Sequence, residues 1–179
     1  YTWVEQTVYI NDIPTNQLKK WLMIEAERFR KPVMRLFHTE LEAVYEEKNR
    51  TLDDDYDKMN NVLFSALWQK HSYGTQTTIG TIEHLKNPSL KKIKDYLNMY
   101  YVPNNIALCM AGDFDPDSAI KWIDQTMGTW VSKPVPAFNP LAENPFAAPI
   151  VKEVVGPFPE TMIVGFRLPG AGTKEADML

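Results

Sequence analysis

The chain has 179 residues, enough for one ordinary domain with a sizeable core, or for one domain and part of another. It is 44% hydrophobic and 12% aromatic, which excludes an intrinsically disordered chain. The net charge is −4 without a basic stripe, which argues against a nucleic-acid partner, and no apolar run approaches the roughly 18 residues of a membrane span.

The two ends of the sequence indicate a piece of a longer protein. The chain begins within a predicted strand rather than with Met, and Leu179 falls a few residues into a possible helix. The single Cys109 excludes an internal disulfide and a zinc site made of several cysteines. Its apolar neighbours, "NIALCMAG", predict a small core residue.

The first two elements in chain order are a strand and a helix. Residues 3–13 partly alternate apolar and polar side chains and include β-branched and aromatic residues, a pattern typical of a strand. "QLKKWLMIEAERF", residues 17–29, predicts a helix that ends before Lys31-Pro32. Its predicted apolar face consists of Leu18, Trp21, Leu22 and Phe29.

Two more helices follow, over about 34–50 and then from the acidic stretch "LDDDYDK" onward. The acidic stretch lacks the glycine and terminal glutamate of a calcium loop, which favours capping of a helix N-terminus instead. Residues 71–87 predict a long polar connection, and Asn87-Pro88 predicts the cap and first turn of the next helix.

The run "IALCMAG", residues 106–112, predicts a strand buried on both faces, and Asp115-Pro116 to Gly128 predicts a helix. Residues 129–149 carry five prolines and predict an extended linker. "IVKEVV" and "TMIVGFRL" then predict two strands of a new domain that begins near Ile150.

These elements predict an α+β fold, with helices packed on one face of a mostly antiparallel sheet. Residues 1–128 would form most of one domain, 129–149 the linker and 150–179 the start of a second domain. We expect the fold to be incomplete at both ends, and the strand at 105–111 to lie inside the protein.

The segment "HTELEAVYEEKNR", residues 38–50, raises the main functional question. At about 100° per residue, Glu40 and Glu47 fall within the apolar stripe of the predicted helix, whereas Glu42 and Glu46 fall on the opposite side. A carboxylate in a core-facing stripe is costly unless it is paired, hydrogen-bonded or bound to a metal. Three explanations stay open: an unseen Arg or Lys partner, a stripe that opens to solvent, or a functional cleft.

Other chemistry is weakly indicated. His38, His71 and His84 have no metal-site spacing, and structural hydrogen bonding is the simpler explanation for each. The glycines do not form a phosphate loop, and no Ser/His/Asp arrangement follows from the spacing.

The motifs resemble those of the pitrilysin/insulinase family of zinc peptidases, the inverzincins. "ELEAVYEEKNR" resembles the family's distal-glutamate helix, and residues 1–29 look like the strand and helix after its zinc motif. "HSYGTQTTIGTIEHL" is similar to the family's His-Pro-Tyr-Gly loop, with Ser72 in place of proline. "YYVPNNIALCMAGDFDP" is similar to its Tyr-x-Pro-x-Asn-Met strand, with Ile106 in place of methionine, and "GPFPETMIVGFRLPG" looks like the opening of its next domain.

The resemblance implies a zinc endopeptidase that acts on peptides or unfolded polypeptides. In that family zinc is held by the two histidines of His-x-x-Glu-His and by one later glutamate, and the motif glutamate acts as general base. The match places the distal ligand on Glu47 and a supporting acidic position on Glu40. His-x-x-Glu-His does not occur in these residues, so this chain is not expected to hold Zn²⁺ or to cleave peptides alone.

Two functions therefore compete. In the first, the chain supplies the distal zinc ligand and part of the substrate chamber to an active parent, working with the parent's remaining domains. The alternative is a non-catalytic half or subunit that clamps substrate or scaffolds an assembly. Two carboxylates in one stripe favour the first, and the resemblance to exported bacterial proteins implies a periplasmic or other extracytoplasmic parent.

Overall fold

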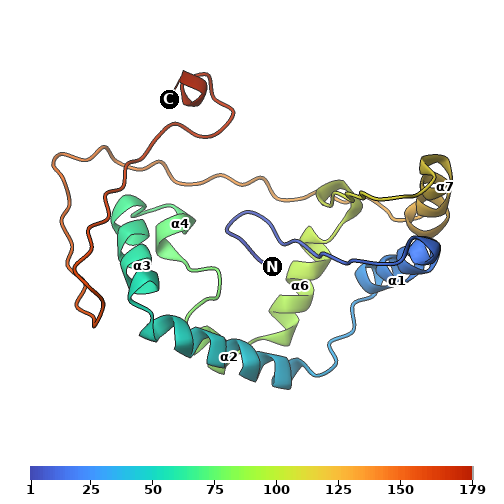
Figure 1. The fold of residues 1–179 in the computed structure, drawn as a ribbon, viewed down its shortest axis with the longest axis horizontal. Coiled ribbons are helices and arrows are strands. Elements are labelled where there is room, and N and C mark those ends of the chain that lie inside the picture. The colour runs from blue at the N-terminus through green and yellow to red at the C-terminus, as the bar shows by residue number, and fades with distance from the viewer. Residues whose placement is uncertain (179) are drawn as a thin grey trace. The chain divides into compact units, whose positions relative to one another are not determined.

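The computed structural model describes residues 1–178, which form helices joined by irregular segments (Figure 1). The contacts within the chain divide it into two compact units. Unit 1 consists of Tyr1, Thr7–Phe37 and Asn87–Phe138, and unit 2 consists of Thr2–Gln6, His38–Lys86 and the chain from Asn139 onward.

Unit 1 is built on two helices that lie side by side, α1 (Leu18–Arg30) and α7 (Pro116–Met127) (Figure 1). A 3₁₀ turn, η1 (Thr15–Gln17), leads into α1. The side chain of Asp115 accepts a hydrogen bond from the Ser118 N–H at 2.8 Å and so caps α7. The core of the unit consists of the buried Leu18, Leu22 and Ala119, with partly buried side chains around them, including Trp21 and Trp122.

The rest of unit 1 contains α6 (Leu90–Tyr100) and the 3₁₀ turn η2 (Pro103–Asn105). The Asn104 side chain exchanges two hydrogen bonds with the backbone of Lys133, at 2.9 and 3.2 Å. This exchange ties Lys133 to η2, which follows α6.

Unit 2 contains most of α2 (Phe37–Asp53), and α3 (Asp55–Leu67), α4 (Ser72–Thr75) and α5 (Ile82–Lys86). The Asp54 side chain caps α3 by accepting a hydrogen bond from the Asp57 N–H at 2.9 Å. Helices α3 and α4 pack against each other, and a side chain at Gly74 would collide with the carbonyl groups of Phe64 and Trp68. Glycine is therefore required at this contact.

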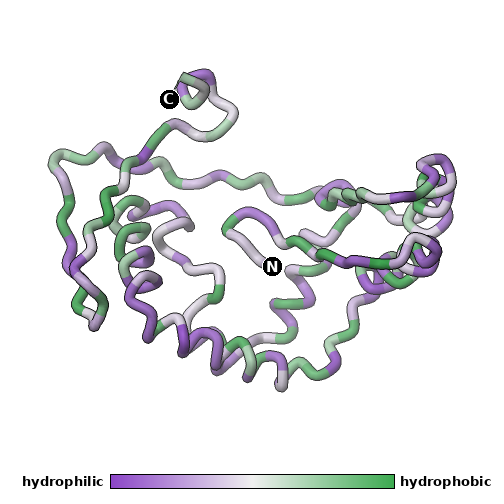
Figure 2. Tube along the Cα trace, in the orientation of Figure 1, coloured by the Kyte–Doolittle hydropathy of each residue, from purple (hydrophilic) through white to green (hydrophobic). Residues whose placement is uncertain are grey.

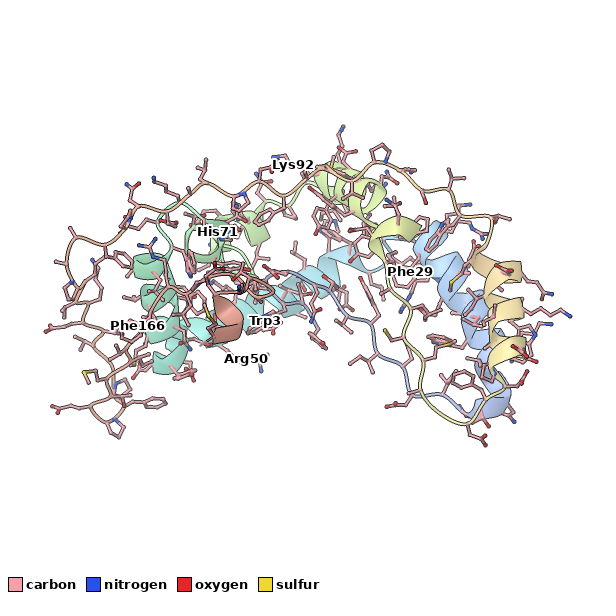
Figure 3. The ribbon with its side chains drawn as sticks, turned by 90° about the horizontal axis from the view of Figure 1, so that it is seen from above. Trp3, Phe29, Arg50, His71, Lys92 and Phe166 are labelled. Atoms are coloured by element: carbon pink, nitrogen blue, oxygen red, sulfur yellow. The ribbon has the colours of Figure 1, made fainter. Side chains whose placement is uncertain are left out.

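An extended segment, residues 150–168, lies against α3 in unit 2. The Phe158 N–H donates a hydrogen bond to the buried Asp55 carboxylate at 3.1 Å, and a Cβ at Gly165 would come within 2.9 Å of Leu63 and Leu67. Hydrophobic residues recur along this segment, and Phe166 lies beside α3 (Figures 2 and 3). Most of its large hydrophobic side chains are nevertheless exposed, among them Val151, Val155, Met162, Val164 and Phe166. The last element is the short turn η3 (Ala176–Met178).

The predicted α+β fold is wrong for residues 1–178, which are helical and contain no sheet. The segments 3–13, 106–112, 150–155 and 161–168 do not form the predicted strands. A helix satisfies its backbone hydrogen bonds within one segment, whereas a strand needs a neighbouring strand. A segment with an alternating or apolar pattern therefore does not form a strand where the described residues provide no neighbouring strand to pair with.

The predicted burial of residues 105–111 is also wrong. Ile106 and Leu108 are 37% and 40% exposed, and Cys109 is an exposed free thiol rather than a core residue. Within this run Met110 packs on the α1–α7 core. The other residues of 105–111 are exposed.

The helix predictions are confirmed. The helices expected over 17–29, over 34–50, after the acidic stretch and over 116–127 all form, with shifts of a few residues at their ends. The cap of α6 is Ser89 rather than Asn87, and its side chain accepts a hydrogen bond from the Lys92 N–H at 3.3 Å. The polar connection at 71–87 contains α4 and α5.

The predicted boundaries at residues 128 and 150 stay predictions. Of the helices in the described part of the chain, none combines the length and hydrophobicity that crossing a bilayer requires.

Candidate functional site

Helix α2 carries the two candidate glutamates and is covered on one side. Its half-buried and buried residues include Leu41, Val44 and Lys48, which recur at the three- and four-residue spacing of one helix face. The Lys86 ammonium lies 5.8 Å from the centre of the Tyr45 ring and covers part of this side. The opposite side of α2 is exposed.

Glu40 and Glu47 are both exposed. The covered face of α2 is centred roughly 80° around the helix from Glu40, so both glutamates lie at its edge rather than in the middle of a core-facing stripe. The predicted position within the apolar stripe is therefore wrong, and both side chains are open to solvent, as one of the three explanations allowed. Both residues do lie on one helix surface, about 20° apart around the axis and about 10 Å apart along it. Neither carboxylate has an ion pair or hydrogen bond from its side chain within residues 1–178.

The two positions differ in their structural explanation. Glu40 lies in the first turn of α2, where a carboxylate stabilises the helix through its dipole. Glu47 lies two turns further along, where the dipole gives no such stabilisation. An exposed charge at Glu47 is thus either a simple solvated side chain or a ligand for something outside the described residues.

The described residues do not complete a zinc site. Zinc in proteins takes three or four nitrogen, sulfur or oxygen ligands. Among the side chains that the structure describes, no group of three or more His, Cys, Asp or Glu is placed to hold an ion. A carboxylate such as Glu47 is of the right chemical type for one ligand, but the remaining ligands are not among these residues.

The loop that follows α3 is a compact aromatic and polar cluster. His71 precedes α4 (Figure 3), and its Nδ1 atom accepts a hydrogen bond from the Tyr73 N–H at 3.1 Å. The His71 ring lies 4.2 Å from the Tyr73 ring and 5.5 Å from the Trp68 ring, measured between centroids. The Tyr73 hydroxyl donates to the Glu5 carboxylate, and this hydrogen bond raises the pKa of Tyr73.

A carboxylate from the proline-rich stretch anchors this loop. Glu143 Oε1 accepts hydrogen bonds from the backbone N–H groups of Lys70 and His71, at 2.6 and 2.8 Å. Burial alone would raise the pKa of Glu143, but these hydrogen bonds, one from Gln69 and the Arg167 charge outweigh it and hold the pKa below its ordinary value. The Arg167 guanidinium lies 3.9 Å from the Glu143 carboxylate.

Sequence reasoning did not identify Glu143 or Arg167. Glu143 and His71 are 72 positions apart, and such a pairing leaves no periodic signal in the sequence. Structural hydrogen bonding is the expectation for His71, and the structure shows it as the cap of α4, a role that the sequence did not predict. Glu40 and Glu47 are brought to one exposed surface, but their roles at a metal stay predictions.

Two comparisons with known proteins bear on the chain. A family model described as "Peptidase M16 inactive domain" matches residues 88–179, which is more than half of the 179 residues. Over 94 residues the chain is 30% identical to "Uncharacterized zinc protease YmxG" of Bacillus subtilis (strain 168). That match covers 52% of this chain and 22% of the relative, so the chain spans about a fifth of the relative's length. These matches confirm the resemblance seen in the motifs: the chain belongs to the peptidase M16 family, the pitrilysin/insulinase family.

Proposed function

We propose that this chain is part of a zinc-dependent endopeptidase that cleaves peptides or unfolded polypeptides. In this proposal the chain supplies one zinc ligand, Glu47, and part of the chamber that receives the substrate. The observation that carries the proposal is the exposed Glu47 carboxylate on α2, which has no cationic partner within residues 1–178. An exposed and unpaired carboxylate can bind a metal without first breaking an ion pair.

Glu40 receives a supporting role. About 10 Å of helix rise separates it from Glu47, whereas zinc binds carboxylate oxygen at roughly 2 Å. Direct binding of one ion by both side chains would require them to bend toward each other along the helix. Indirect contact, in which Glu40 orients a ligand or adjusts the charge of the site, fits this spacing better.

The remaining ligands and the general base would come from other parts of the parent. The described residues hold no metal site of their own, so no catalytic step is assigned to this chain's side chains. The chain's contribution in the proposal is to present Glu47 on a rigid helix. Helix α2 is a good support, because its 17 residues form about 4.7 turns with internal backbone hydrogen bonds.

A second candidate is a non-catalytic part that clamps substrate or supports assembly. The family description that matches residues 88–179 contains the word "inactive", which favours this candidate for that range. Helix α2 (Phe37–Asp53) lies before that range, so the description does not cover the proposed zinc ligand.

The two candidates are separated by zinc content and turnover of the full-length parent. We expect about one zinc per chain by elemental analysis, cleavage of an unstructured peptide, and loss of both on treatment with 1,10-phenanthroline. A His-x-x-Glu-His motif upstream of Tyr1 in the parent reading frame is expected as well. A parent that lacks the motif, holds no zinc and cleaves nothing would support the non-catalytic candidate instead.

An extracytoplasmic location of the parent belongs to the same proposal, and cell fractionation with an antibody against this chain would test it.

A further inference from the structure

Unit 1 contains a cleft that the zinc proposal does not use. Its volume is about 620 Å³, and it is lined by residues from the end of α1, the end of α6, Tyr9 and residues 129–133. Ligand sites in proteins typically have volumes of about 300–1,000 Å³. Phe29, which projects from α1, is one of its walls (Figure 3). The cleft is therefore large enough to hold one or two side chains of a bound partner.

Aromatic rings form the walls of the cleft. The Phe29 ring lies 5.1 Å from the Tyr9 ring, 6.1 Å from the Tyr101 ring and 6.4 Å from the Trp130 ring. The Tyr9 and Tyr101 hydroxyls are hydrogen-bonded to each other at 2.9 Å, which fixes the two rings. Edge-to-face and stacked rings of this kind favour the binding of another aromatic or long apolar side chain.

Positive charge surrounds these rings. Arg28 lies 4.9 Å from the centre of the Tyr9 ring, and its charge is partly neutralised by Glu25. Arg30 donates hydrogen bonds to the Thr126 carbonyl and the Thr129 hydroxyl, but it has no carboxylate partner within residues 1–178. The Lys133 ammonium forms no hydrogen bond or ion pair with the described residues.

No carboxylate is present among the described residues that line the cleft. Burial and the hydrogen bond with Tyr9 raise the pKa of Tyr101 to about 12, so its hydroxyl stays neutral at physiological pH. An anionic group in the cleft would therefore meet two uncompensated cations and no negative charge. The charge of the cleft therefore favours a partner that carries negative charge.

We propose that the cleft binds a polypeptide segment in which an aromatic or leucine side chain stands next to carboxylates. The apolar side chain would enter the cleft and pack against the Phe29 and Trp130 rings that line it, and the carboxylates would face Arg30 and Lys133. The proposal is independent of the zinc site, because no residue of α2 lines the cleft.

Three capped pentapeptides test the proposal by calorimetric titration into the full 179-residue chain. Glu-Phe-Glu-Leu-Glu carries both features, Lys-Phe-Lys-Leu-Lys reverses the charge, and Glu-Ser-Glu-Ser-Glu removes the apolar side chains. We expect binding of the first peptide, and binding at least tenfold weaker for each of the other two. Equal binding of the first two peptides would overturn the role of charge, and no binding of the first would overturn the proposal.

Substitutions at exposed positions of the cleft test the contacts with the peptide directly. Replacing Arg30 and Lys133 together by Gln should weaken binding about threefold to tenfold, since each partly exposed ion pair contributes a few tenths to 1 kcal/mol. Val131 is 74% exposed and lines the cleft, so Val131→Glu, which adds a negative charge, should weaken binding more than the uncharged Val131→Gln does. Far-ultraviolet circular dichroism would verify that each variant keeps its helices.

The matched control removes two exposed cations elsewhere in unit 1, Lys19 and Lys121, by the same change to Gln. Binding that falls equally in this control and in the Arg30/Lys133 variant would contradict a specific site. A second copy of the chain is a competing occupant, because the exposed Tyr56 lies close in sequence to the exposed Asp53 and Asp54. Self-association that weakens in the Arg30/Lys133 variant while the peptide fails to bind would overturn the proposal in favour of that occupant.

Discussion

Helices α1 and α2 both carry glutamates close to their apolar residues, but these glutamates differ in burial and in ion pairing. In α1, Glu25 is 5% exposed and pairs with Arg28 one turn later, while α7 packs on the helix. In α2, Glu40 and Glu47 are exposed and have no ion pair within residues 1–178. Similar sequence patterns thus give one buried structural carboxylate and two accessible ones.

This difference shows how a structural carboxylate can be told from a candidate ligand. A buried carboxylate that has a cation on the next turn is already satisfied, and removing either partner costs stability. An exposed carboxylate without a partner contributes little to folding and stays available for binding. Substitutions at buried and exposed positions of the 179-residue chain test this contrast, and the loss of stability should be greatest in the core of unit 1.

Leu22→Ala should have the largest effect on stability. Leu22 is fully buried in the α1–α7 core, and loss of such a side chain typically costs about 2–5 kcal/mol. Urea unfolding followed by tryptophan fluorescence would measure the change, because Trp21 and Trp122 pack against this core. A change below about 1 kcal/mol would mean that α1 and α7 do not form a core in solution.

Arg28→Ala should lower the free energy of unfolding by about 2–3 kcal/mol, because it leaves the Glu25 carboxylate buried without its partner. The double variant Glu25→Gln, Arg28→Met should recover most of this loss in the same urea experiment. No recovery in the double variant would show that Arg28 acts through its contacts with Tyr9 and Phe29 rather than through the ion pair.

Asp55, the buried carboxylate of α3, should make stability fall in acid. Hydrogen bonds from Lys58 and from the Phe158 N–H outweigh desolvation and hold the pKa of Asp55 below its ordinary value of 3.8. The unfolded state therefore binds the proton more readily, so this stabilisation is present above pH 3.8 and is lost as the pH falls through the lowered folded pKa. Unfolding midpoints measured from pH 6 to pH 2 should show a smaller acid loss for Asp55→Asn than for the wild type.

Glu40→Gln and Glu47→Gln should each change the stability of the chain by no more than about 0.5 kcal/mol, as is usual for exposed side chains. Urea unfolding of the two variants beside Glu42→Gln, which is also exposed on α2, would test this expectation. A loss of more than about 1 kcal/mol at Glu47 alone would indicate a structural role and weaken its assignment as a ligand.

The helices could be predicted from sequence because their signals are local. Asp115-Pro116 and Gly128 bound α7 as predicted, and the Leu18/Leu22 spacing identified the buried face of α1. The strands could not be predicted from segments such as 106–112, because pairing depends on a neighbour and not on the segment's own residues.

The candidate site was predictable only in part. Helical periodicity placed Glu40 and Glu47 on one surface, which the structure shows. The spacing of the apolar residues, however, predicted a covered face centred on the two glutamates, whereas they lie at the edge of the face that is covered. The covered face depends on which neighbours α2 meets, including Lys86 over Tyr45. The aromatic cleft and the Glu143 anchor join residues far apart in sequence, and no periodic pattern predicts such contacts.

Zinc retention by the full-length parent after dialysis, compared between Glu47→Gln and its neighbour Glu46→Gln, decides whether Glu47 is a metal ligand. Both residues are exposed on α2, but about 100° of rotation separates them, so only one can share a surface with Glu40. We predict that Glu47→Gln loses most of the zinc and of the peptide turnover, that Glu40→Gln loses about 10–100-fold in affinity or activity, and that Glu46→Gln behaves like the wild type. Full zinc retention in Glu47→Gln together with loss in Glu46→Gln would contradict the assignment of Glu47 as the ligand.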